Sequence, residues 1–487
     1  MLFNSYDFIF GLLPLTLVAH HYAIDRGPRA STRVLVVASM VFYGWWYWPY
    51  LGLFLASILF NFMVGNRIGD GERTPQARDR ALKFGITANL LTLGFFKYLA
   101  WLVNSATGLI GLGDVLPVLS LPVGISFFTF QQIAWLVDTR KQSSQRDNIW
   151  DYALFVSFFP QLIAGPIVHH GEIMPQLAAN RRPDWNDRAV GFTMFSVGLA
   201  KKLLIADALA PFVEALYGKV HAGALDPTVF EAWQGLLAWH FQLYFDFSGY
   251  SDMALGLGRM FGVKLPVNFE APYRATSMLD FWRRWHLTLT RFLRDYLYVP
   301  LGGNKVGGTR YLRNLFLTIF LAGIWHGAGW TYLLWGLQMG VYQVINAWWV
   351  QRGKSLPSTL LGTFVGRVSV WLCLLFSWPL FRGQTVADAG LILQATVGAN
   401  GAGLGQPKPW LWSAFALCTA IVTLLPTLQQ VMREQDPAWA WRPIDTHTGG
   451  PRWAWKPTLG WAVVTGLLFA ASIPVMDRAN AFLYWNF

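Results

Sequence analysis

Long apolar runs separated by short polar segments dominate the pattern along this chain. Twelve runs approach the roughly 20 residues that an α-helix needs to cross a bilayer. They lie at about 6–23, 34–47, 50–66, 84–103, 119–137, 191–217, 229–250, 314–327, 331–350, 359–381, 409–426 and 458–475. The pattern predicts an all-α, polytopic integral membrane protein with about 10–12 transmembrane helices.

Two apolar stretches need separate interpretation. Residues 152–167 contain the helix breakers Pro160, Gly165 and Pro166, so we expect a re-entrant element that is tolerated only where protein covers it. The first run is too long, and too lightly charged in front, for a cleaved signal peptide. No small-residue cleavage site follows it, so we expect a retained span.

Composition agrees with a membrane protein. Apolar residues make up 54% of the 487 residues and charged residues only 13%, about half the usual share of a soluble domain. A soluble protein of this length would need more polar side chains to cover its core. The 26 tryptophans and 17 tyrosines are residue types that favour the membrane interface.

The net charge of +12 is distributed as membrane topology requires. Most Lys and Arg residues lie in the loops 24–33, 67–83, 138–150, 259–313, 351–354 and 427–457, whereas 48–50 and 104–118 carry none. The positive-inside rule then places the N-terminus outside, and the C-terminus outside as well if all twelve spans are real. Because the loops explain the charge, we expect no nucleic-acid partner.

The basic loop 259–313 is also rich in aromatic residues. One helical face of it carries Trp282, Trp285, Leu289, Phe292 and Tyr296. Another face carries Arg284, Thr288, Arg291 and Asp295. This predicts an amphipathic interfacial helix. Two roles stay open: an anchor in anionic lipid, or a lid over a site for an anionic ligand such as an acyl-CoA, whose phosphates suit guanidinium groups.

Two histidines stand out among nine because of their setting. His326 lies in "GIWHGAGW" (323–330) at the end of an apolar run, and His286 lies on the apolar-leaning side of the predicted amphipathic helix. Each is either a hydrogen-bonded structural histidine or a functional group, since ionisable residues in membrane segments are often functional. Imidazole is the usual general base near neutral pH.

Other familiar catalytic patterns are absent from the sequence. It contains no HExxH, CxxC, GxSxG elbow or P-loop, so we expect neither a metal site nor a bound cofactor. "GLGRMFG" (256–262) follows no predicted strand, and we interpret its glycines as helix-packing positions.

Several polar residues interrupt the predicted spans. "YFDFSGYSDMALGLG" (244–258) contains Asp246, Ser248, Ser251 and Asp252. These residues either cap a helix junction or orient a catalytic imidazole. The lysines within apolar runs are Lys97, Lys201 and Lys202. For these lysines we expect snorkelling, in which the ammonium group reaches the membrane surface.

Four motifs carry a family resemblance: "FFPQLIAGPI", "LYFDFSGYSDMALGLGRMFG", "NFEAPYRATSMLDFWRRWHLTLTRFLRDYLYVPLGGNK" and "GIWHGAGWTYLLWG". They resemble the bacterial branch of the membrane-bound O-acyltransferases, the branch of the alginate O-acetyltransferase membrane subunit. The similarity runs from about residue 42 to about 350 and is most specific over 240–336. We expect one membrane-embedded domain over 1–487, with a motif-bearing core at about 42–350 and further spans at 359–487.

The resemblance implies a many-helix fold around a central funnel. His326 matches the family's essential histidine, and His286 matches a second polar position near the same tunnel. The other positions that we expect along the tunnel are Trp325, Trp285, Trp330, Asp246, Ser248, Arg283, Arg284 and Arg291.

The implied reaction moves an acetyl group from a cytoplasmic thioester to hydroxyls of an exported polysaccharide. Acetyl-CoA is the expected donor substrate, the bacterial inner membrane the expected location, and a periplasmic protein the expected partner. Two departures favour an acceptor other than alginate. His169 and His170 stand where close relatives often carry Arg and Tyr, and Gln338 and Met339 replace a histidine-containing pair.

Two alternatives remain open at this stage. The same scaffold could transfer another acyl group, such as D-alanine, from a carrier protein to a cell-wall polymer. A transporter or export scaffold without chemistry is the alternative of another class. Inverted repeats would be typical of a transporter, and we find no repeat in the sequence.

Overall fold

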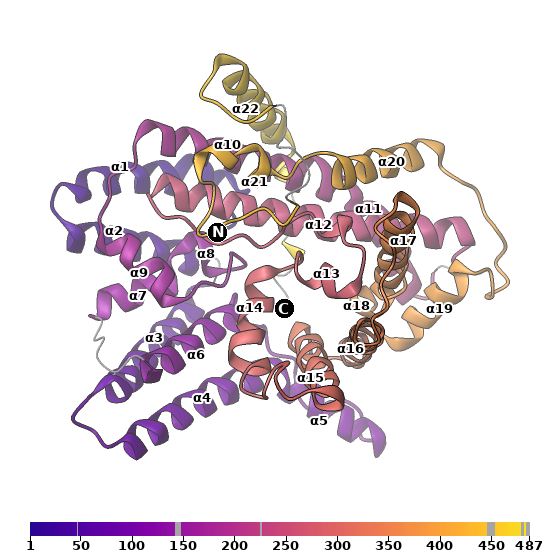
Figure 1. The fold of residues 1–487 in the computed structure, drawn as a ribbon, viewed down its shortest axis with the longest axis horizontal. Helices are drawn as coiled ribbons and strands as arrows, with labels where there is room; N and C mark the ends of the chain where they lie inside the picture. The colour runs from indigo at the N-terminus through magenta and orange to yellow at the C-terminus, as the bar shows by residue number, and fades with distance from the viewer. Residues whose placement is uncertain (46, 142–147, 225, 446–452, 479–481, 484–487) are drawn as a thin grey trace.

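The computed structural model describes residues 1–45, 47–141, 148–224, 226–445, 453–478 and 482–483. Within these ranges all regular secondary structure is helical, and no strand occurs among the described residues (Figure 1). The all-α fold expected from the apolar pattern is therefore confirmed.

Each of the twelve predicted apolar runs overlaps a helix. The first half of the chain contains η1 (Asp7–Leu12), α1 (Leu13–Ile24), α2 (Pro28–Gly44), α3 (Trp48–Gly69), α4 (Pro75–Lys97), α5 (Leu99–Leu109), α6 (Ile125–Lys141), α7 (Ile149–Ser157), α8 (Phe159–Leu162), α9 (His170–Ala178), α10 (Trp185–Ala200), η2 (Lys201–Ala206), α11 (Asp207–His221) and α12 (Val229–Met260). The second half contains η3 (Pro272–Arg274), α13 (Met278–Trp282), α14 (Leu287–Leu293), η4 (Arg294–Tyr298), α15 (Gly308–His326), α16 (Trp330–Gln351), α17 (Leu360–Leu375), α18 (Trp378–Arg382), α19 (Val386–Thr396), α20 (Pro409–Leu424), α21 (Leu428–Val431), η5 (Arg433–Gln435), α22 (Leu459–Ser472) and η6 (Ile473–Arg478).

Several of these helices are long and apolar enough to cross a membrane. Among the described residues, length and hydropathy select five continuous stretches: Asp7–Ile24, Trp48–Gly69, Trp185–His221, Leu360–Arg382 and Leu459–Asp477. The pair α4 and α5, bent by 56° at its break, adds a sixth. The other predicted runs form helices that are shorter or less apolar, so the count of about 10–12 spans stays a prediction.

Helix α12 runs through the middle of the molecule (Figure 1) and packs against α10, η2 and α11. Its glycines allow very close approach: a Cβ atom at Gly256 would lie 2.4 Å from the Gly191 carbonyl oxygen, and one at Gly249 would lie 2.7 Å from that of Gly198. The helix-packing interpretation of the glycine-rich stretch is thus confirmed for Gly256. Helix α22 lies at the edge of the molecule, against α10 (Figure 1).

Buried ion pairs join α12 to η2. The Nζ atom of Lys202 lies 2.7 Å from carboxylate oxygens of both Asp246 and Asp207, and Lys201 Nζ lies 2.6 Å from Asp252. The Lys202 side chain is only 2% exposed, so snorkelling is the wrong explanation for it. The carboxylates on the adjacent helices neutralise both ammonium groups inside the protein, so neither has to reach the membrane surface.

The segment predicted as one amphipathic helix is divided into α13, α14 and η4. Helix α13 ends at Trp282 and α14 begins at Leu287, with His286 between them in a left-handed conformation (φ 44°). Arg284 and Thr288 of the polar face are buried because they find partners inside the protein: Thr288 Oγ1, for example, donates to Asn268 at 2.6 Å. The prediction of one continuous amphipathic helix at the interface is therefore wrong for this segment.

The stretch 152–168 is buried throughout, so protein covers it as a re-entrant element would require. Helix α7 ends before Phe158, whose ψ of 106° is not helical, and the short α8 starts beside Pro160. Proline fits there because the first helical positions need no amide hydrogen.

We predict that the Lys202–Asp246 pair is a stability determinant. Asp246→Asn removes one of the two carboxylates at Lys202 and is expected to destabilise the fold by about 3 kcal/mol, because a buried charge loses compensation. The triple variant Lys202→Met/Asp246→Asn/Asp207→Asn is expected to lose less, because it removes all three charges of the cluster. Thermal melting in detergent measures both, and a wild-type melting temperature for Asp246→Asn would contradict the prediction.

Glu270, in the loop between α12 and η3, gives the fold a pH dependence. Its side chain is buried, which raises its pKa from 4.5 to about 7, although Trp441 Nε1 donates to it at 2.8 Å. Folding therefore favours the protonated form, and this contribution is complete below pH 4.5 and lost as the pH rises through 7.

Glu270→Gln should flatten that dependence. As the pH rises from 5 to 8, we expect the free energy of unfolding of the variant to increase relative to that of wild type, by at most about 3 kcal/mol. Melting temperatures of both proteins at the two pH values test this, and parallel pH profiles would refute it.

Candidate active site

His326 is the last residue of α15 and is enclosed by aromatic rings. Its side chain is 2% exposed, and its ring centroid lies 5.0 Å from that of Trp325, 5.3 Å from that of Trp335 and 5.2 Å from that of Phe381. These rings come from α15, α16 and α18, so three helices hold one imidazole. Such an enclosure excludes water from the imidazole.

The glycines around His326 make this position possible. A Cβ atom at Gly323 would lie 2.3 Å from the Cα atom of Gly336, so α15 and α16 pack backbone to backbone. A Cβ atom at Gly327 would lie 2.1 Å from the ring of Tyr332. The motif "GIWHGAGW" is therefore explained by close packing that ends α15 directly at the histidine.

His326 lies next to cavities of very different size. A narrow cavity of about 10 Å³ is lined by His326 and apolar side chains. Its aromatic walls are Phe281, Trp282, Trp285, Trp335, Trp378 and Phe381. A larger cavity of about 790 Å³ is lined by Gly327 and Ala328, the residues that directly follow the histidine, and by Lys97.

His286 lies on the other side of Trp325. It is 1% exposed, its ring centroid lies 6.5 Å from that of Trp325, and its ring packs edge-on against Phe247 at 4.7 Å. It is close enough to His326 for the two to interact electrostatically. The fold thus brings together the two histidines that the sequence singles out. The left-handed backbone at His286 is an unfavourable conformation of the kind that clusters at functional sites.

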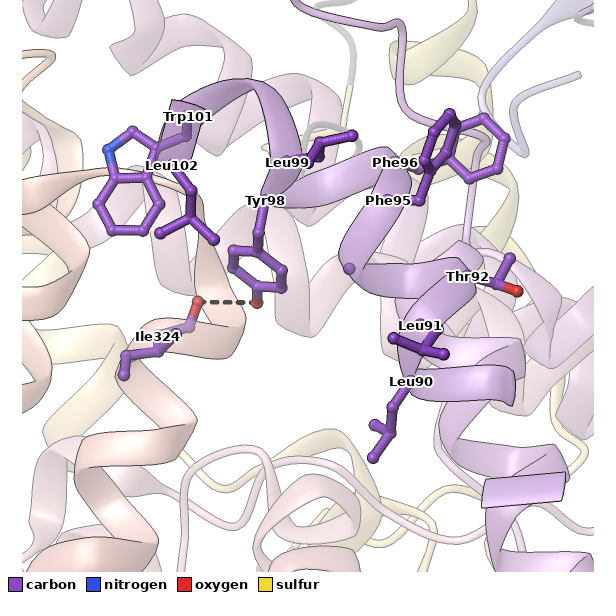
Figure 2. A pocket seen from close by; sticks show the side chains of 11 residues that line it. Leu90, Leu91, Thr92, Phe95, Phe96, Tyr98, Leu99, Trp101, Leu102 and Ile324 are labelled. Atoms are coloured by element: carbon purple, nitrogen blue, oxygen red, sulfur yellow. Dashed lines mark hydrogen bonds between the residues drawn. The ribbon is translucent and has the colours of Figure 1, made fainter. Parts of the chain in front are cut away.

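The break between α4 and α5 caps the end of α15. Lys97 Nζ donates to the carbonyl oxygen of Trp325, and the Tyr98 hydroxyl donates to that of Ile324 at 3.0 Å (Figure 2). Carbonyl groups in the last turn of a helix have no partner within the helix. Two consecutive residues of another helix pair therefore satisfy two consecutive carbonyls directly before His326. The snorkelling prediction is wrong for Lys97 as well, because its ammonium group points into the protein, toward the Trp325 carbonyl oxygen.

A third cavity, of about 900 Å³, lies along the bend of α4 and α5 and reaches Ile324 (Figure 2). Apolar side chains dominate its lining, among them Leu90, Leu91, Phe95, Trp101 and Leu102. Its chemistry suits hydrocarbon chains rather than a polar substrate.

The other aromatic positions expected along the tunnel are placed differently. Trp285 lines the narrow cavity with His326, and Trp325 stacks on Phe130 with ring centroids 5.3 Å apart. Trp330 is 54% exposed and packs against Trp101 instead. The structure brings Trp285 and Trp325 to the histidine, but not Trp330.

The polar positions on α12 are buried beside the site. Asp246 pairs with Lys202 and accepts a hydrogen bond from the Leu483 backbone N–H at 3.0 Å. Ser248 is 3% exposed, on the same helix as Phe247, which contacts His286.

Among the described residues, two of the three arginines expected to bind the donor have carboxylate partners. Arg284 donates two hydrogen bonds to Asp445, at 2.7 and 3.1 Å, and Arg291 pairs with Glu172. Arg283 is exposed. A phosphate-bearing donor would have to compete with Asp445 and Glu172, whereas Arg283 is accessible at once.

Sequence reasoning missed the contribution of the C-terminal region. Trp378 and Phe381 of α18 close the narrow cavity, although this region looked like hydrophobic spans only. Trp378 Nε1 donates to Nδ1 of the buried His240 at 2.9 Å, which fixes the orientation of the indole ring. The proline between aromatic residues in "SWPLF" (377–381) is the available sequence signal for a helix start there.

Several known proteins are similar to this chain in sequence. The chain is 40% identical to "Peptidoglycan O-acetyltransferase" of Helicobacter pylori, over 83% of this chain and 81% of that protein. It is 40% identical to "Probable alginate O-acetylase AlgI" of Azotobacter vinelandii, over 79% and 76% of the two chains. "Teichoic acid D-alanyltransferase" of Streptococcus thermophilus is 29% identical over 48% of this chain and 59% of that protein.

The family model also covers most of the chain, including both histidines and the residues that cap α15. This model describes the MBOAT family and matches residues 50–352 of the chain. The chain therefore belongs to the membrane-bound O-acyltransferase family and is a membrane-embedded acyltransferase.

Proposed function

We propose that the protein transfers an acetyl group from acetyl-CoA, on the cytoplasmic side, to hydroxyl groups of an exported polysaccharide, with His326 as general base. The observation that carries the proposal is the position of His326, which lines a closed aromatic cavity while the next residues line a large polar one. The names of the two relatives at 40% identity support acetyl as the group and a cell-envelope polymer as the acceptor.

The reaction needs one proton acceptor and one electrophile. The imidazole of His326 takes the proton of the acceptor hydroxyl, whose oxygen attacks the thioester carbonyl carbon. The tetrahedral intermediate collapses with cleavage of the carbon–sulfur bond, and the CoA thiolate takes a proton from the imidazolium. The aromatic enclosure protects the thioester from hydrolysis.

His286 contributes from the donor side in this proposal. A neutral imidazole donates one hydrogen bond, and here it would donate to the carbonyl oxygen as negative charge develops on it. The left-handed backbone at His286 aims the ring toward Trp325 and the interior rather than along a helix surface. A periplasmic protein that brings the polymer to this site belongs to the same proposal.

His326→Ala is expected to lower acetyl transfer at least about 100-fold, because the general base is lost. Purified protein in nanodiscs would receive acetyl-CoA labelled in the acetyl group, with and without periplasmic extract. Thermal melting checks that the variant is folded. Equal turnover in the variant and the wild type would remove His326 from the mechanism, and no turnover of any thioester by wild type would favour a conduit without chemistry.

His286 variants separate the imidazole from its unusual backbone. Asn tolerates the left-handed conformation better than Ala and keeps an N–H donor. We expect His286→Ala to lose about 100-fold in kcat, and His286→Asn to lose less at a melting temperature near that of wild type. Identical kcat for both variants and wild type would exclude a role for His286 in the chemistry.

The teichoic acid relatives make D-alanyl transfer the competing function of the same site. The donor distinguishes the two functions, because acetyl-CoA needs no carrier protein. Turnover of D-alanyl carrier thioester in place of acetyl-CoA would overturn the acetyl proposal while leaving the role of His326 intact.

A further inference from the structure

Two tryptophans beside His326 carry buried N–H groups without an acceptor. Trp282 is 7% exposed and Trp335 is 3% exposed, and the Nε1 atom of each is buried with no hydrogen-bond partner among the described residues. An indole N–H can only donate, so burying it without an acceptor is unfavourable. A buried donor of this kind calls for an explanation, and one explanation is a role in catalysis.

The position of these two indoles distinguishes them from other tryptophans. Trp378 lines the same narrow cavity, but its Nε1 atom donates to His240 at 2.9 Å. Trp239, Trp412 and Trp455 also have a buried Nε1 atom with no partner in the described part of the chain, yet none of them lines the cavity of the catalytic imidazole. The two indoles in question therefore combine an available donor with a place beside the reacting groups.

Both indole rings form walls of the cavity that His326 lines. The Trp335 ring is nearly perpendicular to the imidazole, at an interplanar angle of 87° and a centroid distance of 5.3 Å. The Trp282 ring centroid lies 6.4 Å from that of Trp335. The cavity between these walls measures about 10 Å³, of the order of one water-sized group. A single carbonyl oxygen matches that volume, and it is an acceptor for N–H donors.

We propose that the N–H groups of Trp282 and Trp335 form the oxyanion hole of the acyl transfer. When the acceptor oxygen attacks the thioester carbonyl carbon, the π electrons of the C=O bond move to the carbonyl oxygen, and both indoles donate to the negative charge that develops there. When the intermediate collapses, that electron pair re-forms the carbonyl, and the electrons of the C–S bond leave with sulfur. The indoles keep their protons throughout.

This inference rests on the proposed transfer and names further groups that stabilise its intermediate. An oxyanion accepts several hydrogen bonds, so the indole donors act together with His286. The aromatic wall then has two functions, because the same rings that exclude water also supply hydrogen bonds to the reacting carbonyl.

The test removes the N–H group and keeps the shape of the ring. Benzothienylalanine is the analogue of tryptophan in which sulfur replaces N–H, and it is introduced singly at positions 282, 335 and 412 of the full chain in nanodiscs. Trp412 is the matched control, because its buried Nε1 atom also lacks a partner among the described residues but lies outside the site. Initial rates with labelled acetyl-CoA give kcat and KM, and thermal melting gives stability.

Loss of either donor at the site should lower kcat about 100-fold, because the transition state loses one hydrogen bond to its developing charge. The KM for acetyl-CoA should change less than about threefold, since this interaction is made mainly in the transition state. The melting temperature should not fall, because the protein offers no acceptor to the N–H that is removed. The analogue at position 412 should leave kcat at the wild-type value.

The donor complex provides a second readout that does not depend on turnover. His326→Ala, which lacks the general base, is saturated with acetyl-CoA carrying carbon-13 at the thioester carbonyl, and the carbonyl stretch is recorded by infrared spectroscopy. Adding benzothienylalanine at position 335 should move the band to higher wavenumber, because the carbonyl oxygen loses a donor.

Three results would contradict the inference: a wild-type kcat with the analogue at both site positions, a kcat that falls together with the melting temperature, or an equal loss of kcat at position 412. The second result would reduce the indoles to packing groups. If wild type consumes no acetyl-CoA, the acetyl proposal fails by itself, and the same variants are compared with D-alanyl carrier thioester, whose carbonyl develops the same charge. Lack of turnover with both donors would end the inference together with the transfer.

Discussion

A helix that ends inside an apolar protein leaves carbonyl groups without partners, and the end of α15 is built around that constraint. Lys97 and Tyr98 satisfy two of these carbonyls from the break between α4 and α5. The helix can therefore stop at His326 without reaching water. The imidazole belongs to the last residue of the helix, and the chain continues from there with an extended backbone at Gly327. The bend in α4 and α5 and the close contact of α15 with α16 both serve this one arrangement.

The same constraint governs the charges deeper in the fold. Lys201 and Lys202 are buried beside α12, and carboxylates of adjacent helices neutralise them. Glycines bring α10 and α12 close enough together to place η2 and its lysines against the aspartates. These two lysines thus have carboxylate partners built into the packing. Among the described residues, no ion pair is found for Lys97, which lies at the cavity that follows His326.

The sequence predicts those features that depend on local pattern. Apolar runs locate the helices because burial in lipid or protein imposes the same composition along each one. His326 is conspicuous because an imidazole interrupts such a run. The break at His286 was not predictable in the same way. The residues around it have a helical period, and only tertiary partners such as Asn268 and Asp445 make the broken form favourable.

The contacts between residues far apart in the chain could not be predicted from the sequence either. Trp325 and Trp330 lie in the same short motif of the sequence. Trp330 nevertheless faces the outside of α16, whereas Trp325 faces the site. Phe381 reaches His326 from a helix more than fifty residues further along the chain. Snorkelling was a reasonable expectation for each lysine, because a sequence does not reveal which carboxylate or carbonyl will lie opposite.

The proposed transfer requires the narrow cavity beside His326 to open. A volume of about 10 Å³ is no more than the space of one water molecule, so it cannot hold a thioester and its acyl group. In that proposal, donor binding displaces some of the aromatic side chains that close this cavity. Trp282 and Trp285 belong to the broken segment around His286, so two of the rings that close the cavity lie where the helix is interrupted. The donor side of the proposed transfer is therefore closed until the substrate binds, while the cavity of about 790 Å³ is already formed. In that transfer a closed donor side would keep water from the thioester.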